Sequence, residues 1–252
     1  MRIVSLISAG TEMLFALGLG EQVVGVSHEC DFPSECQKLP RVSRANVNSN
    51  DSSQQIDDTV RQLLAEGKPL YEIDRDLLAS LKPDLVVTQA QCDVCAVKYD
   101  DVVSTVNTLP ELKQTQIFSL NPQSLADVLD DIQHLGEATG CPNQAARLVA
   151  DLNSRIEVVR KSAAEVSSQD RPRTAMIEWT EPLMLAGNWV PELVELAGGN
   201  CPLTTPGEHS HYHTWEELRQ FDPEVMVVCP CGFDEHRARQ ELNLLAKHPG
   251  WK

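Results

Sequence analysis

The sequence is poor in aromatic residues and in basic ones. Aromatic side chains make up 5% of the 252 residues, and 21 basic residues stand against 37 acidic ones. The resulting net charge of -16 repels nucleic acid and anionic membranes, and it favours solubility or a basic partner. We therefore expect no nucleic acid among the partners of this protein.

Segments that direct a chain to or across a membrane are also missing. No stretch has the length and apolar character of a transmembrane helix, and the opening residues lack the hydrophobic region and cleavage site of a secretory signal. As it stands, the sequence predicts a cytoplasmic protein without direct membrane insertion, or a periplasmic one whose signal has been removed. Without a signal, we expect the eight cysteines to be reduced thiols.

The familiar catalytic motifs are absent as well. The chain has no G-x-S-x-G elbow, no phosphate-binding loop, no G-x-G-x-x-G fingerprint and no H-E-x-x-H zinc motif. These absences disfavour an enzyme, and we predict that the protein is not one.

What is present is an alternation of strands and helices. Short apolar runs predict strands at residues 2–6, 23–26, 85–88, 117–120, 174–178 and 225–229. Amphipathic segments predict helices at residues 11–17, 57–65, 74–80, 97–106, 190–197, 214–220 and 235–245. Thr11 is the expected N-cap of the first helix. This alternation predicts an α/β fold with mostly parallel central sheets and helices on their faces.

A long helical stripe interrupts the alternation in the middle of the chain. Apolar residues recur at helical spacing through residues 124–166, with Gly140 and Pro142 marking a break between two helices. We therefore predict an N-terminal α/β lobe at residues 1–122, a connecting helical segment at 123–168 and a C-terminal α/β lobe at 169–252. The last lobe stops where another strand is expected, so we expect it to be truncated.

Unusual residues follow the predicted strands. In open α/β sheets, ligands bind at the carboxyl ends of strands. The segments at these ends are residues 8–12, 28–31, 89–95, 178–181 and 229–233. We therefore predict a binding site built from these segments.

Two cysteine pairs lie within these segments. Cys92 and Cys95 form a C-x-x-C motif after a strand, which fits half of a zinc site, a redox pair or simple packing of a loop. Cys229 and Cys231 flank a single proline, where an internal disulfide would be strained, so metal ligation or a plain turn is favoured. These four cysteines are the candidate metal ligands.

Histidine and tryptophan supply the other candidates. His28, and the alternating His209, His211 and His213, offer imidazoles suited to Zn, Ni, Cu or the cobalt of a corrinoid, although exposed polar loops explain them equally well. Trp179 and Trp189 offer broad apolar faces for a large flat ligand, against the common fate of tryptophan as a core residue. Trp215 and Trp251 have weaker claims.

The pattern as a whole resembles the class III periplasmic binding proteins, the family of vitamin B12, siderophore and haem binding proteins of ABC importers. The resemblance rests on residues 2–6, 11–20, 23–27, 81–87, 178–179, 187–193, 197–199 and 229–233, and it extends over essentially the whole chain. Its details are most similar to a signal-less, cobalamin-binding branch.

The resemblance implies two lobes joined by a long helix, with a corrinoid such as cobalamin or a similar metal chelate captured between them. It also implies a monomer that delivers its ligand to an ABC-transporter permease. The predicted ligand-binding residues are Ser8, Thr11, His28, Gln91, Trp179, Trp189, His211 and Phe233. Two alternatives stay open: direct binding of Zn or another transition metal by the Cys and His clusters, and a cytoplasmic thiol enzyme using Cys92 or Cys95.

Overall fold

A computed structural model describes residues 1–247, and the contacts within it divide the chain into two compact units. Unit 1 comprises Met1–Asn48, Thr59–Pro122 and Asp127–Ala150, and unit 2 comprises Ser49–Asp58, Gln123–Ala126 and the chain from Asp151 onward. Each unit is therefore assembled from segments that are separate in the sequence. The lobe boundaries predicted at residues 122 and 168 stay a prediction.

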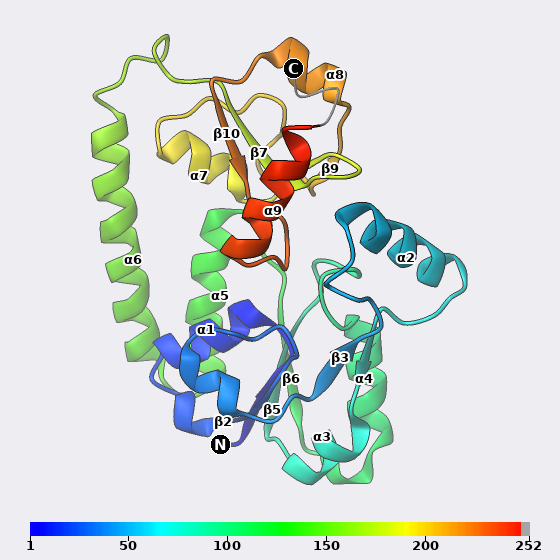
Figure 1. The fold of residues 1–252 in the computed structure, drawn as a ribbon. Coiled ribbons are helices and arrows are strands. Elements are labelled where there is room, and N and C mark those ends of the chain that lie inside the picture. The colour runs from blue at the N-terminus through cyan, green and yellow to red at the C-terminus, as the bar shows by residue number, and fades with distance from the viewer. Residues whose placement is uncertain (248–252) are drawn as a thin grey trace. The chain divides into compact units, whose positions relative to one another are not determined.

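A sheet of four parallel strands forms the centre of unit 1, in the order β2–β1–β5–β6 (Figure 1). The strands are β1 (Ile3–Ser5), β2 (Val23–Val26), β5 (Leu85–Gln89) and β6 (Gln116–Leu120). Every residue of β1 and β5 is buried, which explains why these segments read as continuous apolar runs rather than alternating ones.

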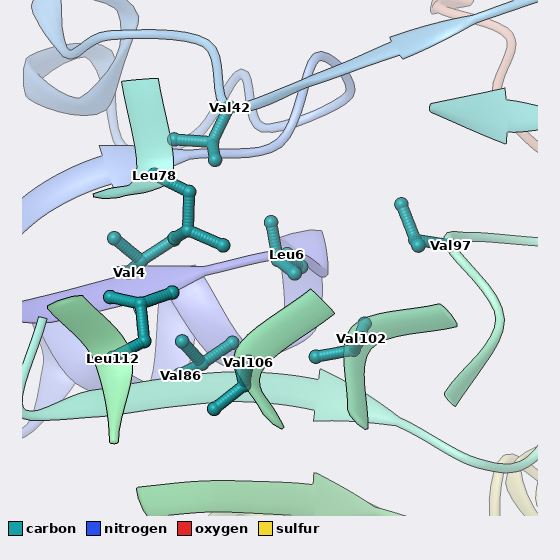
Figure 2. Close-up of a cluster of buried hydrophobic side chains, with 9 residues drawn as sticks. All are labelled: Val4, Leu6, Val42, Leu78, Val86, Val97, Val102, Val106 and Leu112. Carbon is teal, nitrogen blue, oxygen red and sulfur yellow. The ribbon is translucent and has the colours of Figure 1, made fainter. Parts of the chain in front are cut away.

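Helices accompany this sheet, as the alternation predicts. They are α1 (Ser8–Ala16), α3 (Arg75–Leu81) and α4 (Tyr99–Thr108), while α2 (Ser53–Ala65), α5 (Leu125–Ala138) and α6 (Pro142–Ala163) each have residues in both units. Figure 2 shows the core of unit 1, where valines and leucines of β1, β5, α3 and α4 meet. Burying each of these side chains contributes about 1.5–3 kcal/mol.

A two-stranded antiparallel ribbon, absent from the sequence prediction, completes unit 1. It pairs β3 (Ser43–Ala45) with β4 (Tyr71–Ile73). The first strand lies within residues 28–50, which the sequence predicts to be a loop. The ribbon matters for the site, because it carries Ser43 and Tyr71.

Unit 2 is built on a second four-stranded sheet, in the order β10–β7–β8–β9. The strands are β7 (Thr174–Trp179), β8 (Met184–Leu185), β9 (His211–Tyr212) and β10 (Val225–Val228), and the helices are α7 (Val190–Leu196), α8 (Trp215–Phe221) and α9 (Glu235–Leu245). Strands β7 and β10 are parallel, whereas the two-residue strands β8 and β9 add antiparallel pairs.

The predicted α/β fold class is confirmed, and so is the break in the central helical stripe. Helix α5 ends shortly before Gly140, which adopts a φ of 74°, and Pro142 is the first residue of α6. Glycine accepts a positive φ without steric cost, and proline fits the first turn of a helix. The expected truncation and Trp251 concern residues 248–252, which lie outside the described part of the chain.

Candidate functional site

Three of the predicted ligand-binding residues follow neighbouring strands of the first sheet. Ser8 comes after β1, His28 after β2 and Gln91 after β5, and these strands are adjacent and parallel. They therefore lie along one edge of the sheet, as predicted. The Ser8 hydroxyl donates a hydrogen bond to the Glu29 carbonyl oxygen at 3.1 Å, which connects two of the three segments.

Thr11 plays a different part from the one predicted. Helix α1 begins at Ser8 with Ile7 as its N-cap, so Thr11 lies inside the helix rather than at its start. Its side chain is 0% exposed, and its hydroxyl is 3.4 Å from the Ile7 carbonyl oxygen and 3.1 Å from the Cys30 sulfur. A threonine that bonds the carbonyl four residues earlier is fully occupied within its helix. Thr11 is therefore not presented to a ligand here.

His28 is held from several sides. Its Nδ1 is 2.8 Å from the Ser43 hydroxyl, its ring centroid is 5.3 Å from that of Tyr71, and its Nε2 is 3.3 Å from a Glu29 carboxylate oxygen. Hydrogen bonding to the imidazole lowers the pKa of Glu29 and outweighs the opposing effect of partial burial. The His28 side chain is 18% exposed, but its Nε2 atom is buried.

Cys92 and Cys95 are joined by a disulfide, which differs from the predicted reduced thiols. The buried Gln89 side chain donates to the Cys92 carbonyl oxygen at 2.6 Å and accepts from the Cys92 amide at 2.7 Å. Gln91 beside them is half-buried. Disulfide sulfurs are not thiolates, and thiolates are what zinc binds. In this form the pair cannot act as the predicted metal ligands.

An aromatic pair stands at the carboxyl ends of β7 and β10 in unit 2. The ring centroids of Trp179 and Phe233 are 5.3 Å apart with an interplanar angle of 49°. The Trp179 indole Nε1 donates to the carbonyl oxygens of Ser53 and Glu181, at 3.2 and 3.1 Å. The Arg237 guanidinium lies over the Phe233 ring, 4.6 Å from its centroid. The structure thus brings together two residues that were predicted separately.

A buried polar cluster adjoins this pair, and the sequence reasoning missed it. The Glu241 carboxylate accepts hydrogen bonds from the hydroxyls of Thr180 and Ser53 at 2.6 and 3.2 Å, and from Arg237 at 3.2 Å. Arg237 also donates to the carbonyl oxygen of Asp51 at 2.6 Å. The i,i+4 spacing of an Arg and a Glu on α9 is the signal that could have found the ion pair, but not its burial.

A pocket of about 180 Å³, open to solvent, lies against this cluster. It is lined by Ser52, Ser53, Gln54, Thr180, Glu181, Glu241 and Leu245. Because Glu241 already accepts three hydrogen bonds, its role here is to support neighbouring groups rather than to bind a cation.

The histidine segment brings two imidazoles together. The ring centroids of His211 and His213 are 4.5 Å apart, as alternation on an extended strand predicts. Burial, reinforced by His211, lowers the pKa of His213 against an opposing effect of Glu217. His211 itself is exposed. The lowered pKa of His213 favours the neutral imidazole that a metal or a corrinoid cobalt would need.

The remaining predicted residues are Trp189, Cys229 and Cys231, and the Cys231 amide donates a hydrogen bond to the carbonyl oxygen of Glu178, the residue before Trp179, at 3.1 Å. Trp189 is half-buried at the start of α7, and within residues 1–247 it has no aromatic partner. Cys229 and Cys231 are exposed residues with reduced thiols. The Cys229 sulfur is itself partly buried, and this burial, together with the Glu178 charge, raises the pKa of the thiol, which disfavours a thiolate. In the described part of the chain, no three His, Cys, Asp or Glu residues are arranged to hold a metal ion. The predicted metal ligands therefore stay a prediction without structural support.

Two α/β units, each with polar or aromatic side chains at the carboxyl ends of its strands, are the organisation of a two-lobed binding protein. The chain belongs to the periplasmic binding protein family, whose sequence profile matches residues 3–252. This confirms the resemblance predicted from the sequence motifs, and with it the prediction of a binding protein rather than an enzyme. No helix among residues 1–247 has the length and apolar character to cross a membrane.

Curated relatives include an uncharacterised ABC transporter substrate-binding lipoprotein, YvrC, of Bacillus subtilis, which is 28% identical over 180 residues, 70% of this chain and 46% of that one. A vitamin B12-binding protein of Vibrio vulnificus is 24% identical over 235 residues, 91% of this chain and 71% of that one. The chain thus aligns with less than half of the Bacillus relative.

Solved structures share the fold. The vitamin B12 binding protein BtuF of Vibrio cholerae superposes with a TM-score of 0.62 at 21% identity, covering 89% of this chain and 74% of that one. A periplasmic heme binding protein of Pseudomonas aeruginosa gives a TM-score of 0.71 at 18% identity, covering 99% and 78%.

Proposed function

We propose that this protein is a substrate-binding protein that captures a corrinoid, cobalamin being the ligand we expect, and delivers it to the permease of an ABC importer. Family membership and the vitamin B12-binding proteins among the relatives support this choice. Neighbours in fold are named for vitamin B12 and for haem, which are both large, flat metal chelates. These names support a metal chelate as the class of ligand, and the corrinoid is our specific proposal within it.

The observation that carries the proposal is the Trp179–Phe233 pair. Aromatic side chains bury a large apolar area when they bind a ligand. The Trp179 N–H already donates to two carbonyl oxygens, so the indole needs no hydrogen-bond acceptor from the ligand. Arg237 stacks on Phe233 and holds that ring in place. A preorganised aromatic surface of this kind suits the apolar edges of a corrin ring.

Polar residues in each unit are proposed to complete the recognition. In unit 1, Ser8, His28 and Gln91 lie at the carboxyl edge of the first sheet, and His28 offers an imidazole to the cobalt. In unit 2, His211 is the exposed imidazole and Trp189 a further half-buried indole. Corrinoids carry amide side chains, which hydroxyl and amide groups can bind by hydrogen bonds.

The variant Phe233→Ala tests the proposal, and Phe221→Ala is its matched control. Both phenylalanines are half-buried in unit 2, but Phe221 ends α8, before β10 begins, and so belongs to the opposite edge of the sheet. Losing an apolar face that the ligand buries costs about 1.5 kcal/mol. We expect cobalamin affinity, measured by calorimetry, to fall about tenfold in Phe233→Ala. Equal affinities in the two variants would show that the aromatic pair does not contact the ligand.

Delivery to a permease is tested separately. The net charge of -16 suits docking to a basic surface, and such docking weakens as salt screens it. The permease ATPase in proteoliposomes should be stimulated by the cobalamin-loaded protein, and less at high salt. Cobalamin binding without any stimulation would separate capture from transport.

A further inference from the structure

The Cys92–Cys95 disulfide has no part in the proposed ligand capture, yet it is placed to react. It follows β5, and Asp93, Val94 and Cys95 are all exposed, Val94 by 40%. We propose that Cys92 and Cys95 form a redox-active thiol–disulfide site, which exchanges with small thiols of the glutathione class. The C-x-x-C spacing is the one used by thiol–disulfide exchange centres.

The loop that carries the pair is fixed by contacts other than the disulfide. Gln89 holds the backbone of Cys92 through two hydrogen bonds, and the Tyr71 hydroxyl donates to the Val94 carbonyl oxygen at 2.9 Å. On the far side, Ala96 and Val97 are buried, at 6% and 1% exposure. Because both flanks are anchored independently, the disulfide can open and close without refolding of the unit.

Stabilisation of the fold does not account for the pair. The two cysteines are three residues apart in sequence, and a disulfide that closes so short a loop removes little entropy from the unfolded chain. Exposed disulfides that contribute little to stability are readily reduced by thiols.

The two sulfurs are not equivalent. Cys95 is exposed, whereas Cys92 is half-buried and held at its backbone. We therefore assign the first attack to the Cys95 sulfur. A thiolate bonds to Cys95 Sγ as the Cys92–Cys95 bond breaks, and Cys92 leaves as a thiolate that takes a proton from water. A second thiolate then attacks the reagent sulfur, which releases Cys95 and one molecule of oxidised reagent. The two thiols are oxidised as the protein disulfide is reduced by two electrons.

The other cysteines provide an internal contrast. Cys30, Cys36, Cys141 and Cys201 are buried free thiols. They should resist alkylation for as long as the protein is folded, and they therefore report unfolding within the same sample.

Mass spectrometry of one peptide tests the proposal. Trypsin should release residues 76–98, since the bond after Lys82 precedes a proline, and this peptide contains Cys92 and Cys95 but no other cysteine. Native, ligand-free protein is equilibrated in buffers of reduced and oxidised glutathione, alkylated with N-ethylmaleimide, denatured and digested. We expect the peptide to pass reversibly between its disulfide and its doubly alkylated form, while Cys36 and Cys141 stay unmodified.

Two single variants test the order of attack. Cys92→Ser leaves Cys95, which should form a mixed disulfide with oxidised glutathione faster than Cys92 does in Cys95→Ser. Equal or reversed rates would overturn the assignment of the attacked sulfur. Two results would overturn the proposal itself. In the first, peptide 76–98 is alkylated only when Cys36 and Cys141 are alkylated too; in the second, the reduced peptide never returns to the disulfide. No corrinoid is present in these experiments, so their failure leaves the proposed function untouched.

Discussion

Replacing Glu241 with alanine is expected to destabilise unit 2 by about 3 kcal/mol. The residue is 1% exposed and accepts three hydrogen bonds, from Ser53, Thr180 and Arg237. Removing one partner of a buried ion pair costs about 3–5 kcal/mol. The lower end applies because Arg237 keeps the Asp51 carbonyl oxygen and its side chain is 21% exposed.

Glu241→Gln is the matched variant, since it preserves the shape and one acceptor oxygen. A hydrogen bond to a charged group stabilises a fold by about 1 kcal/mol more than one to a neutral group. We therefore expect Glu241→Gln to lower the free energy of unfolding by about 1 kcal/mol. In a double-mutant cycle, Arg237→Met should cost less in the Glu241→Ala background than in the parent protein, because only its contacts with Asn50, Asp51 and Phe233 are then left to lose. The pair also holds residues 50–53 within unit 2, so amide exchange there should accelerate in Glu241→Ala.

Urea unfolding followed by tryptophan fluorescence is the appropriate assay. All four tryptophans lie between residues 179 and 251, within the sequence range of unit 2, so their emission follows this unit and not unit 1. A loss below about 1 kcal/mol in Glu241→Ala, or equal losses for alanine and glutamine, would refute the argument that a buried, paired carboxylate stabilises this unit.

Two further predictions concern unit 1. Gly136→Ala should destabilise it by about 1–3 kcal/mol, measured by calorimetry, because the added Cβ would lie 2.3 Å from the Ala145 Cβ. A second substitution in the same chain, Ala145→Gly, should restore most of the lost stability. If it restores none, the steric clash lies elsewhere. The second prediction concerns Asp131, whose pKa in the folded protein is raised mainly by burial. Its protonated form stabilises the fold fully below the unfolded pKa, and this stabilisation is lost as the pH rises through the folded pKa. Asp131→Asn should therefore raise the free energy of unfolding at pH 7 more than at pH 4, by under about 1 kcal/mol, as measured by urea unfolding at the two pH values. The exposed Asp130→Asn removes only one of the smaller causes of the Asp131 shift and should respond more weakly. An equal response of both variants would contradict this.

Elements with a strong local pattern could be predicted from the sequence. Strand β5 is a continuous apolar run bounded by Pro83, and α9 was predicted with its observed bounds, Glu235–Leu245. The ribbon of β3 and β4 and the strands β8 and β9 were missed, because each is two or three residues long and depends on a partner strand rather than on its own pattern.

Individual residues of the candidate site could be predicted from the sequence, but the contacts between them could not. Trp179 and Phe233 were each identified as strand-end residues, yet their contact requires the ends of β7 and β10 to meet. The cluster around Glu241 draws on Ser53 and Thr180, which are 188 and 61 residues away in the sequence. Nothing in the local sequence of residues 49–58 indicates that this segment belongs to unit 2 rather than to unit 1.

The most direct test of the central claim is a calorimetric titration of metal-stripped protein with cobalamin, with haem and zinc as parallel ligands. The proposed function predicts cobalamin binding with a micromolar or lower Kd, about -8 kcal/mol or better, and weaker binding of haem and zinc. Tight haem binding with no heat from cobalamin would keep the chelate class but contradict the corrinoid. Zinc binding alone would contradict the account and return attention to the cysteine and histidine clusters.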